Sequence, residues 1–149
     1  SKGILHRDIK SHNIMTSESG YVLMDFGLSR SSLLGSQTST GAVIGTLGYS
    51  APEQITNSSL DERTDIFGLG VVLYEMVTGT MPFKGNNEMA LLHSLFNLDP
   101  VEPGKINELV PKALSDVILN CLQKNPQNRY QSSEELVSSL ERIKNYDEQ

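Results

Sequence analysis

Apolar residues along this chain predict two short strands near its start and helices over the rest. The short strand-like runs 13–16 and 21–24 are separated by residues 17–20, which end in a glycine, and two such runs joined by a glycine-containing loop predict a β-hairpin. The stretch 66–77 is apolar on all sides, which predicts a helix buried in a core. A membrane-spanning helix needs about 20 apolar residues. This stretch is shorter, so we expect no membrane segment in this chain.

Helical periodicity continues through the second half of the chain. We expect helices over residues 86–97 and 111–122, the second with a proline in its first turn. Ser132 and Glu135 have the spacing of a capping box, which predicts the start of another helix. Gly79 is expected to end the buried helix, and residues 98–110 are expected to form a loop. The expected inward-facing residues are Leu91, Leu92, Leu95, Phe96, Leu114, Val117, Ile118, Cys121, Leu136, Leu140 and Ile143.

Composition narrows the class of protein. The chain has 149 residues, of which 38% are hydrophobic and 20% charged, as expected for one globular domain with a core. Its net charge of −6 argues against a general nucleic-acid surface, because such a surface needs clustered Lys and Arg. The single Cys121 excludes an internal disulfide. The chain begins with Ser1 and shows no signal peptide, and we expect it to be cut from a longer chain.

Candidate chemistry is concentrated in residues 6–13, which read HRDIKSHN, and in the tripeptide DFG at 25–27. Asp8 and Asn13 lie five positions apart on a polar segment. The predicted hairpin would bring Asp25, at its far end, back beside Asn13, at its start. An amide oxygen and a carboxylate placed together form a pair of oxygen ligands suited to Mg²⁺. Asp8 would lie nearby as a third polar group.

These segments resemble the catalytic loop and metal loop of the eukaryotic-type (Hanks-type) serine/threonine protein kinase family. Residues 45–53, GTLGYSAPE, resemble the family's segment that ends in its APE motif, and the three motifs occur in the family's order. The resemblance covers essentially the whole chain but only the second half of the family's fold. It implies a mainly α fold (α+β overall): the large, C-terminal kinase lobe, helical with a short catalytic-loop hairpin, without the small lobe.

The resemblance implies a role for each polar residue of the two loops. Asp8 would orient a Ser or Thr hydroxyl and accept its proton, and Lys10 would stabilise the transferring phosphoryl group. Asn13 and Asp25 would hold Mg²⁺, or Mn²⁺, which bridges the phosphates of ATP. An ordinary surface lysine is the other interpretation of Lys10.

The same resemblance implies residues that support the loops. Asp65 would hydrogen-bond the backbone of the HRD segment, although an Asp at this position can also be a plain helix N-cap. Arg129 would pair with Glu53 of the APE motif. The other supporting residues would be His6 and Phe26, which pack and align the loop, together with Arg7 and Gly27.

The stretch between Gly27 and Ala51 is rich in Ser, Thr and Gly and contains no acidic residue, which predicts a mobile loop. It is either a solvated linker or an activation segment that awaits phosphate. Arg7 favours the second, because an Arg directly before the catalytic Asp can pair with a phosphorylated Thr and order the loop. Thr40 is the first candidate for phosphorylation and Thr38 the second. Thr46, with Lys10, resembles the Ser/Thr-specific combination at the substrate pocket.

The chain lacks a G-x-G-x-x-G loop, a strand lysine of the V-A-I-K type and its partner glutamate. These belong to the small lobe, which we expect to precede Ser1. We therefore divide the chain into a C-terminal kinase lobe over residues 1–145 and a tail over 146–149. Within the lobe, the catalytic loop is 6–13, the activation segment 25–53 and the helical subdomain 61–145.

The expected function is transfer of the ATP γ-phosphate to Ser or Thr hydroxyls of a protein substrate, with activity absent from this chain alone. A non-catalytic kinase-like lobe that docks partners is the alternative. A degenerate lobe usually loses HRD or DFG residues, and here all are present, which favours an enzyme. We expect a cytoplasmic protein or the cytosolic part of a membrane-anchored one, with no nucleic-acid partner.

Overall fold

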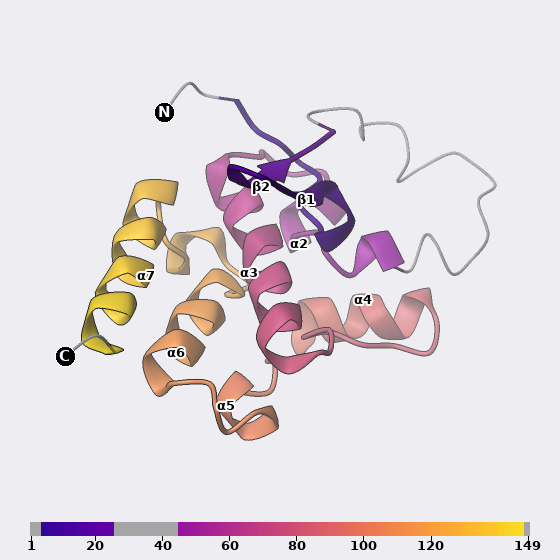
Figure 1. The fold of residues 1–149 in the computed structure, drawn as a ribbon. Helices are drawn as coiled ribbons and strands as arrows, with labels where there is room; N and C mark the ends of the chain where they lie inside the picture. The colour runs from indigo at the N-terminus through magenta and orange to yellow at the C-terminus, as the bar shows by residue number, and fades with distance from the viewer. Residues whose placement is uncertain (1–3, 26–44, 148–149) are drawn as a thin grey trace.

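The structure is a computed structural model that describes residues 4–25 and 45–147, with side chains as far as residue 144. The expected mainly α fold with one hairpin is confirmed (Figure 1). In chain order the elements are η1 (Ser11–Asn13), β1 (Ile14–Ser17), β2 (Gly20–Leu23), α2 (Pro52–Ile55), α3 (Glu62–Thr78), α4 (Glu88–Asn97), α5 (Pro103–Ile106), α6 (Lys112–Cys121), η3 (Pro126–Asn128) and α7 (Ser133–Asp147).

Helix α3 runs through the middle of the molecule. Figure 1 shows α6 and α7 on one side of it and α4 on the other, with α5 near its C-terminal end. Because neighbours cover it from several directions, its buried residues include Phe67, Val71 and Tyr74 and are not confined to one stripe. The predicted buried helix is confirmed, although it begins at Glu62, before the apolar run.

Both ends of α3 are capped. Asp61 is the N-cap, and its side chain accepts the backbone N–H of Arg63 at 3.0 Å. The interpretation of Asp65 as the N-cap is therefore wrong, because Asp65 lies inside the first turn of the helix. At the other end, Gly79 adopts φ 69°, as the C-cap prediction requires, and donates its N–H to the carbonyl of Glu75 at 2.8 Å.

Glycines let two neighbours approach α3 closely. A β-carbon on Gly68 would lie 3.1 Å from both Cβ and the carbonyl oxygen of Ile9, in the HRDIKSHN segment. A β-carbon on Gly70 would lie 2.6 Å from Cβ of Cys121 in α6, a distance that real contacts essentially never show. The helix can therefore seat α6 at this distance only because position 70 has no side chain, and a side chain at position 68 would require the polar loop to shift slightly.

The predicted hairpin is confirmed. Strands β1 and β2 pair antiparallel, with Ile14 opposite Leu23 and Ser17 opposite Gly20. One further hydrogen bond extends the ladder, from the N–H of Met24 to the carbonyl of Asn13 at 2.8 Å. The residue after Met24 is Asp25, so the hairpin brings Asp25 back close to Asn13, the last residue of the polar loop.

The later helices follow their predicted ranges with small differences. Helix α4 begins at Glu88 because Asn87 is its N-cap and accepts the N–H of Ala90. The expectation of an unbroken loop over 98–110 is wrong, since Pro103 starts the short helix α5. Pro111 lies at the N-cap of α6 and outside the helix itself.

The capping box before α7 is present in modified form. The hydroxyl of Ser132 accepts the N–H of Glu135 at 3.2 Å, as expected. The Glu135 carboxylate accepts the N–H of Gln131 at 2.7 Å, one residue earlier than in the usual box.

The core consists of two clusters packed around α3. The buried residues of the larger cluster are Leu47, Tyr49, Ala51, Phe67, Val71, Val72, Tyr74, Phe83, Leu91, Leu95, Ile118 and Leu122, and those of the smaller are Ile66, Val117, Cys121 and Leu136. Leu92, Phe96, Leu114, Leu140 and Ile143 are partly buried against them, which confirms the predicted inward-facing set.

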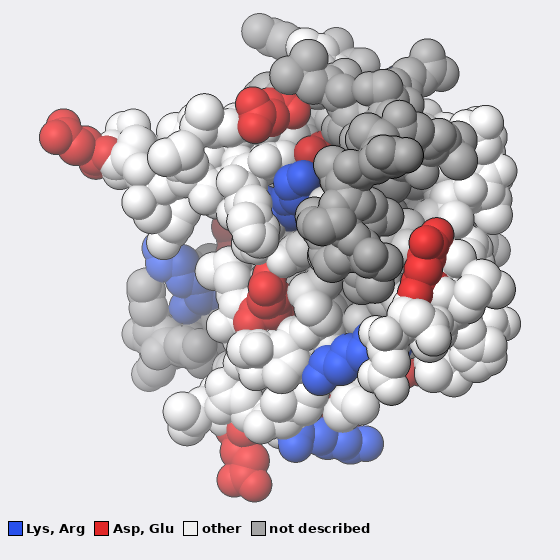
Figure 2. Space-filling view, turned by 90° about the vertical axis from the view of Figure 1, so that its right-hand side faces the viewer, with Lys and Arg blue, Asp and Glu red and all other residues white. Residues whose placement is uncertain are grey.

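Two surface properties bear on function. No helix in the described part of the chain has the length and hydropathy to cross a membrane. Figure 2 shows a face on which Lys and Arg side chains are scattered among Asp and Glu, with no large basic patch among the residues described there.

Candidate active site

Helix α3 holds the HRDIKSHN segment through its backbone. The Asp65 carboxylate accepts the N–H of His6 with Oδ2 at 2.7 Å and the N–H of Arg7 with Oδ1 at 2.8 Å. Asp65 lies in the first turn of a buried helix, so it is a rigid support for these bonds. Together with the contact of Ile9 on Gly68, this fixes the polar loop against the start of α3.

Asp8 lies at the centre of a small polar cluster. The Nδ2 group of Asn13 donates to the Asp8 carbonyl at 2.8 Å and to its Oδ2 at 3.0 Å. Lys10 Nζ lies 3.2 Å from the same Oδ2. Both contacts with the carboxylate fall on one oxygen, Oδ2, and no partner for Oδ1 is found among the described residues. A carboxylate held through one oxygen, with the other free, can accept a proton from a ligand.

Asn13 and Asp25 offer oxygen atoms near this cluster. Asn13 is buried, and because its Nδ2 faces Asp8, its Oδ1 is the atom left for a cation. Asp25 follows Met24, which is hydrogen-bonded to Asn13, and it is exposed with φ 59°. Mg²⁺ is usually bound by one or two protein oxygens together with water and phosphate, so these two donors fit that ion.

Nowhere in residues 4–25 and 45–144 do three or more His, Cys, Asp or Glu side chains gather in a way that could hold a metal ion. Asn13 and Asp25 supply two oxygen donors, so an ion bound there would also need oxygens from water or a ligand.

His6 connects the polar loop to the end of the hairpin. Its Nδ1 accepts the N–H of Asp8 at 3.2 Å, which leaves Nε2 to carry the ring proton and donate to the carbonyl of Met24 at 2.7 Å. The ring is buried. One side chain thus orients the backbone of both Asp8 and the residue before Asp25.

Beside the polar loop lies a cavity of about 810 Å³. Thr46 and Tyr49 line one side, Lys10 and Asn13 another, and Glu75 of α3 contributes a carboxylate. An elongated ligand that reaches Asp8 can extend into this space.

A chain of hydrogen bonds crosses the cavity wall. The Tyr49 hydroxyl donates to Oε2 of Glu75 at 2.5 Å, and the Ser11 hydroxyl donates to the Tyr49 oxygen at 2.9 Å. Burial, and after it the hydrogen bond to Glu75, raises the pKa of Tyr49 above its ordinary value. The bonds tie the polar loop, the 45–50 turn and α3 together.

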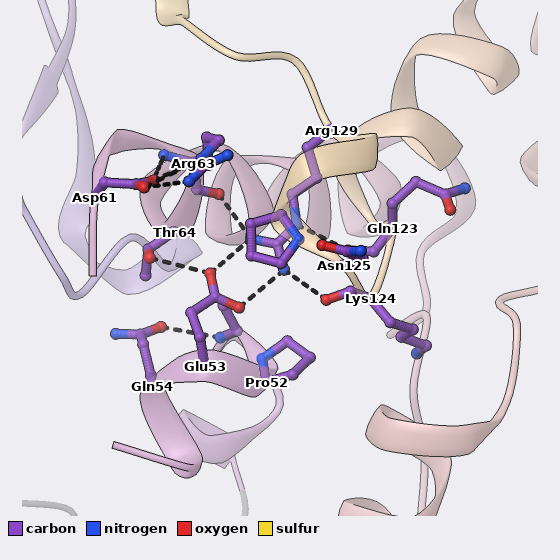
Figure 3. A network of polar contacts seen from close by, with 12 residues as sticks. Pro52, Glu53, Gln54, Asp61, Arg63, Thr64, Gln123, Lys124, Asn125 and Arg129 are labelled. Carbon is purple, nitrogen blue, oxygen red and sulfur yellow. Dashed lines mark hydrogen bonds and ion pairs between the residues drawn. The ribbon is translucent and has the colours of Figure 1, made fainter. Parts of the chain in front are cut away.

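Below the 45–50 turn, Glu53 and Arg129 form a buried ion pair (Figure 3). Arg129 Nη1 and Nη2 donate to the two carboxylate oxygens at 2.6 and 2.9 Å. The Thr64 hydroxyl donates to Oε1 of Glu53 at 3.0 Å. Arg129 also donates to three backbone carbonyls, those of Gln123, Lys124 and Arg63. Both charges are therefore well solvated by the protein.

The structure does not bear on every predicted site residue. Phe26, Gly27, Thr38 and Thr40 lie outside the described residues. Arg7 is described and exposed. Five residues that the sequence did not indicate also hold the cluster through hydrogen bonds: Ser11, Tyr49, Gln54, Thr64 and Glu75. Ser11, Tyr49 and Gln54 lie in or next to motifs, but nothing in the sequence pairs them with their distant partners.

The model of the protein kinase domain family matches residues 1–140 of this chain. The chain belongs to the protein kinase family. This confirms the resemblance to Hanks-type serine/threonine kinases that the motifs indicated. Among similar proteins, serine/threonine-protein kinase PknB of Mycobacterium tuberculosis is 42% identical to this kinase chain over 146 residues, which are 96% of the chain.

Two more relatives agree with this assignment. A Clostridium perfringens protein named "Probable serine/threonine-protein kinase" is 40% identical over 95% of the chain, and PknB of Mycobacterium leprae is 43% identical over 95%. The aligned region is 21% of the Clostridium protein and 23% of each PknB. The kinase chain thus spans about a fifth of the length of the relatives it matches.

Proposed function

We propose that this chain is the large, C-terminal lobe of a serine/threonine kinase catalytic domain, which transfers the γ-phosphate of ATP to Ser or Thr hydroxyls of proteins. The observation that supports this most is the arrangement around Asp8. Lys10 and Asn13 both hold Oδ2, which leaves Oδ1 to meet a hydroxyl group. The residue division given above (lobe 1–145, tail 146–149) is part of the proposal.

Asp8 is the residue that orients the acceptor hydroxyl. The hydroxyl oxygen forms a bond to the γ-phosphorus as the bond from that phosphorus to the bridging oxygen of ADP breaks, and the hydroxyl proton passes to Asp8. Lys10, 3.2 Å from Asp8, stabilises the negative charge of the transferring group. This chemistry requires mainly positioning and charge neutralisation, which the backbone anchor on Asp65 supports.

Asn13, through Oδ1, and Asp25, through its carboxylate, would hold Mg²⁺ or Mn²⁺. When bound, the ion neutralises charge on the ATP phosphates. Asn13 also keeps Asp8 oriented through Nδ2, so the amide would place the base and the metal at a set separation. The residues that grip the rest of ATP would come from a small lobe encoded before Ser1.

The cavity lined by Thr46 and Tyr49 would receive the acceptor segment of the protein substrate. Arg7, which is exposed, would bind a phosphate on Thr40 or Thr38 and so regulate activity. Since ATP is the co-substrate, we place the domain in the cytoplasm, by itself or as the cytosolic part of a membrane-anchored protein. A docking lobe without catalysis is the competing function. The Oδ1 atom of Asp8, which has no partner among the described residues, favours the enzyme.

Transfer of radiolabelled phosphate from ATP with Mg²⁺ tests the proposal. Four proteins are compared: the chain, the chain extended N-terminally through its gene, and each of these with Asp8→Asn. The extended form is expected to label a protein substrate, and Asp8→Asn to abolish labelling. Asp116→Asn in the extended form, a change to an exposed carboxylate remote from the site, serves as the matched control and should leave labelling intact.

If the extended protein neither transfers phosphate nor binds ATP, the docking function is favoured instead.

A further inference from the structure

Arg7 has a backbone conformation that needs support. Its φ of 65° lies in the left-handed region, which residues other than glycine rarely adopt. Such a conformation persists only where the surrounding structure holds it, and it is often found at functional sites. Arg7 directly precedes Asp8, so whatever holds this conformation also determines how Asp8 is presented.

The N–H side of Arg7 is held by Asp65, as described above. Its carbonyl accepts a hydrogen bond from Nε2 of Gln54 at 3.0 Å. This carbonyl belongs to the peptide bond between Arg7 and Asp8, whose N–H donates to the His6 ring at 3.2 Å. Both polar groups of that peptide bond are therefore fixed by side chains, one from α2 and one from the loop itself.

Gln54 is itself well oriented for this bond. Its Oε1 accepts the backbone N–H of Ala51 at 2.9 Å, at the start of α2. With the carbonyl oxygen occupied by a donor, the amide nitrogen must face an acceptor. Figure 3 shows Gln54 pointing to one side of this helical turn and Glu53 to the other, toward Arg129. The Glu53–Arg129 ion pair anchors α2, and the Gln54 side chain extends from α2 to Arg7 of the catalytic loop.

The space around this contact is small. A cavity of about 10 Å³, bordered by Gln54, Arg7, Asp8 and Asp65, lies between α2, the loop and α3. This is at the lower limit for one water molecule. A shortened side chain at position 54 would admit water as a substitute partner for Arg7, so a decisive test keeps the length of the side chain.

We propose that Gln54 is a positioning residue for Asp8: by donating to the Arg7 carbonyl it holds the left-handed peptide that aims the Asp8 carboxylate, and it joins the substrate-side segment 45–55 to the catalytic loop. This inference rests on the proposed kinase function. The Gln54 amide bonds the backbone of Arg7 and Ala51 and does not line the cavity proposed for the acceptor, so it should affect the rate of transfer and leave the affinity for ATP unchanged.

Two substitutions separate the two hydrogen bonds of Gln54. Gln54→Glu keeps an acceptor for Ala51 and removes the donor to Arg7. Gln54→Lys keeps a donor for Arg7 and removes the acceptor for Ala51. In the N-terminally extended protein, Gln54→Glu is expected to lower kcat about 10- to 100-fold, the range seen when catalytic groups shift slightly, with KM for ATP unchanged. Gln54→Lys is expected to lower Tm and to keep kcat within about threefold.

The controls distinguish this inference from the proposed function. Gln127→Glu makes the same chemical change at an exposed position of η3 and should alter neither kcat nor Tm. An inactive wild-type protein would refute the kinase proposal itself. With an active wild type and an inactive Asp8→Asn, a Gln54→Glu protein of normal kcat would overturn the role of Gln54. So would equal loss of kcat in Gln54→Glu and Gln54→Lys, which would indicate support of α2 only. If Gln54→Glu does not fold, Gln54→Met, which lacks both the donor and the acceptor, is compared with Gln54→Lys, which keeps the donor. A kcat of Gln54→Met equal to that of Gln54→Lys would overturn the role of Gln54.

Discussion

Glu53 and Arg129 lie 76 positions apart in sequence and pair through both carboxylate oxygens and both terminal guanidinium nitrogens. The pair is almost completely buried, with 8% of Glu53 and 3% of Arg129 exposed. It joins the substrate-side segment 45–55 to the chain between α6 and α7. A buried ion pair of this kind stabilises a fold only while both partners are present.

Glu53→Gln should therefore lower the free energy of unfolding by about 3–5 kcal/mol, because Arg129 keeps its charge in a buried site with no anion beside it. For a domain of this size the loss corresponds to a fall in Tm of roughly 6–20 °C. Thermal unfolding followed by circular dichroism measures it. Asp116→Asn, which breaks the exposed pair with Lys112, should leave Tm nearly unchanged. Equal Tm values for wild type and Glu53→Gln would show that the pair contributes nothing.

Tyr49→Phe should lower stability by about 1.5–3 kcal/mol, since it removes a hydrogen bond to the charged Glu75. It should also raise KM for the protein substrate, because the turn that carries Thr46 loses its connection to α3. Urea unfolding and steady-state kinetics measure the two effects.

Tyr74→Phe is the matched control for this change. The Tyr74 hydroxyl donates to the carbonyl of Val101 at 2.8 Å, away from the cavity. Loss of this neutral bond should lower stability by about 0.5–1.5 kcal/mol and leave KM unchanged. An equal rise in KM for both variants would contradict a specific role of Tyr49 at the cavity.

Cys121 should be chemically inert in the folded protein. Burial raises the pKa of its thiol to about 12, so at pH 8 only about one molecule in 10,000 carries the reactive thiolate. Alkylation by iodoacetamide at pH 8 should be roughly 1,000-fold slower than in urea-unfolded protein. Rapid labelling under native conditions would show that α6 separates from α3 without global unfolding.

Lys124→Met should stabilise the protein at neutral pH. Burial lowers the pKa of Lys124 to about 8, its Nζ lies 3.5 Å from the centre of the Phe83 ring, and no hydrogen-bond partner for it is found within the described chain. The folded state thus disfavours the charged amine. Because the side chain is only half-buried, we expect a gain of about 1 kcal/mol at pH 7.

The pH dependence checks the cause of that gain. The folded protein loses the Lys124 proton near pH 8, whereas the unfolded chain keeps it until about pH 10.5. Wild-type stability therefore rises between these two values through this group, and the advantage of Lys124→Met should shrink over the same interval. Urea midpoints of both proteins at pH 7 and 9.5 measure it. A constant advantage would assign the gain to packing instead.

Features of the fold that depend on residues close together in the sequence could be predicted, and contacts between distant residues could not. The hairpin, the buried helix and the inward faces of α4, α6 and α7 follow from local periodicity, because neighbours in sequence determine which face is apolar. The short helix α5 was missed because two prolines and a glycine favour a loop, although Pro103 also suits a first helical turn. The N-cap at Asp61 was missed because the apolar run begins several residues later.

The sequence indicated the candidate site residues that lie within the motifs, but not the residues outside them that hold the site together. HRDIKSHN and DFG pointed to Asp8, Lys10, Asn13 and Asp25 without any structure. The hydrogen bonds from Gln54 to Arg7 and from Tyr49 to Glu75 join segments that no periodicity relates, so only the fold reveals them. The left-handed φ of Arg7 could not be predicted either, because arginine rarely adopts this conformation.

Three of the contacts described above originate on one helix: Asp65 holds the catalytic loop, Thr64 holds Glu53 and Glu75 holds Tyr49. Each residue of an α-helix is rotated by about 100° from the one before it. One residue inserted between Asp65 and Glu75 would rotate Glu75 by about 100° relative to Thr64 and Asp65. The bond to Tyr49 and the bonds to Glu53 and the catalytic loop could then no longer form together. Helix α3 is thus the part of the chain least able to vary in length.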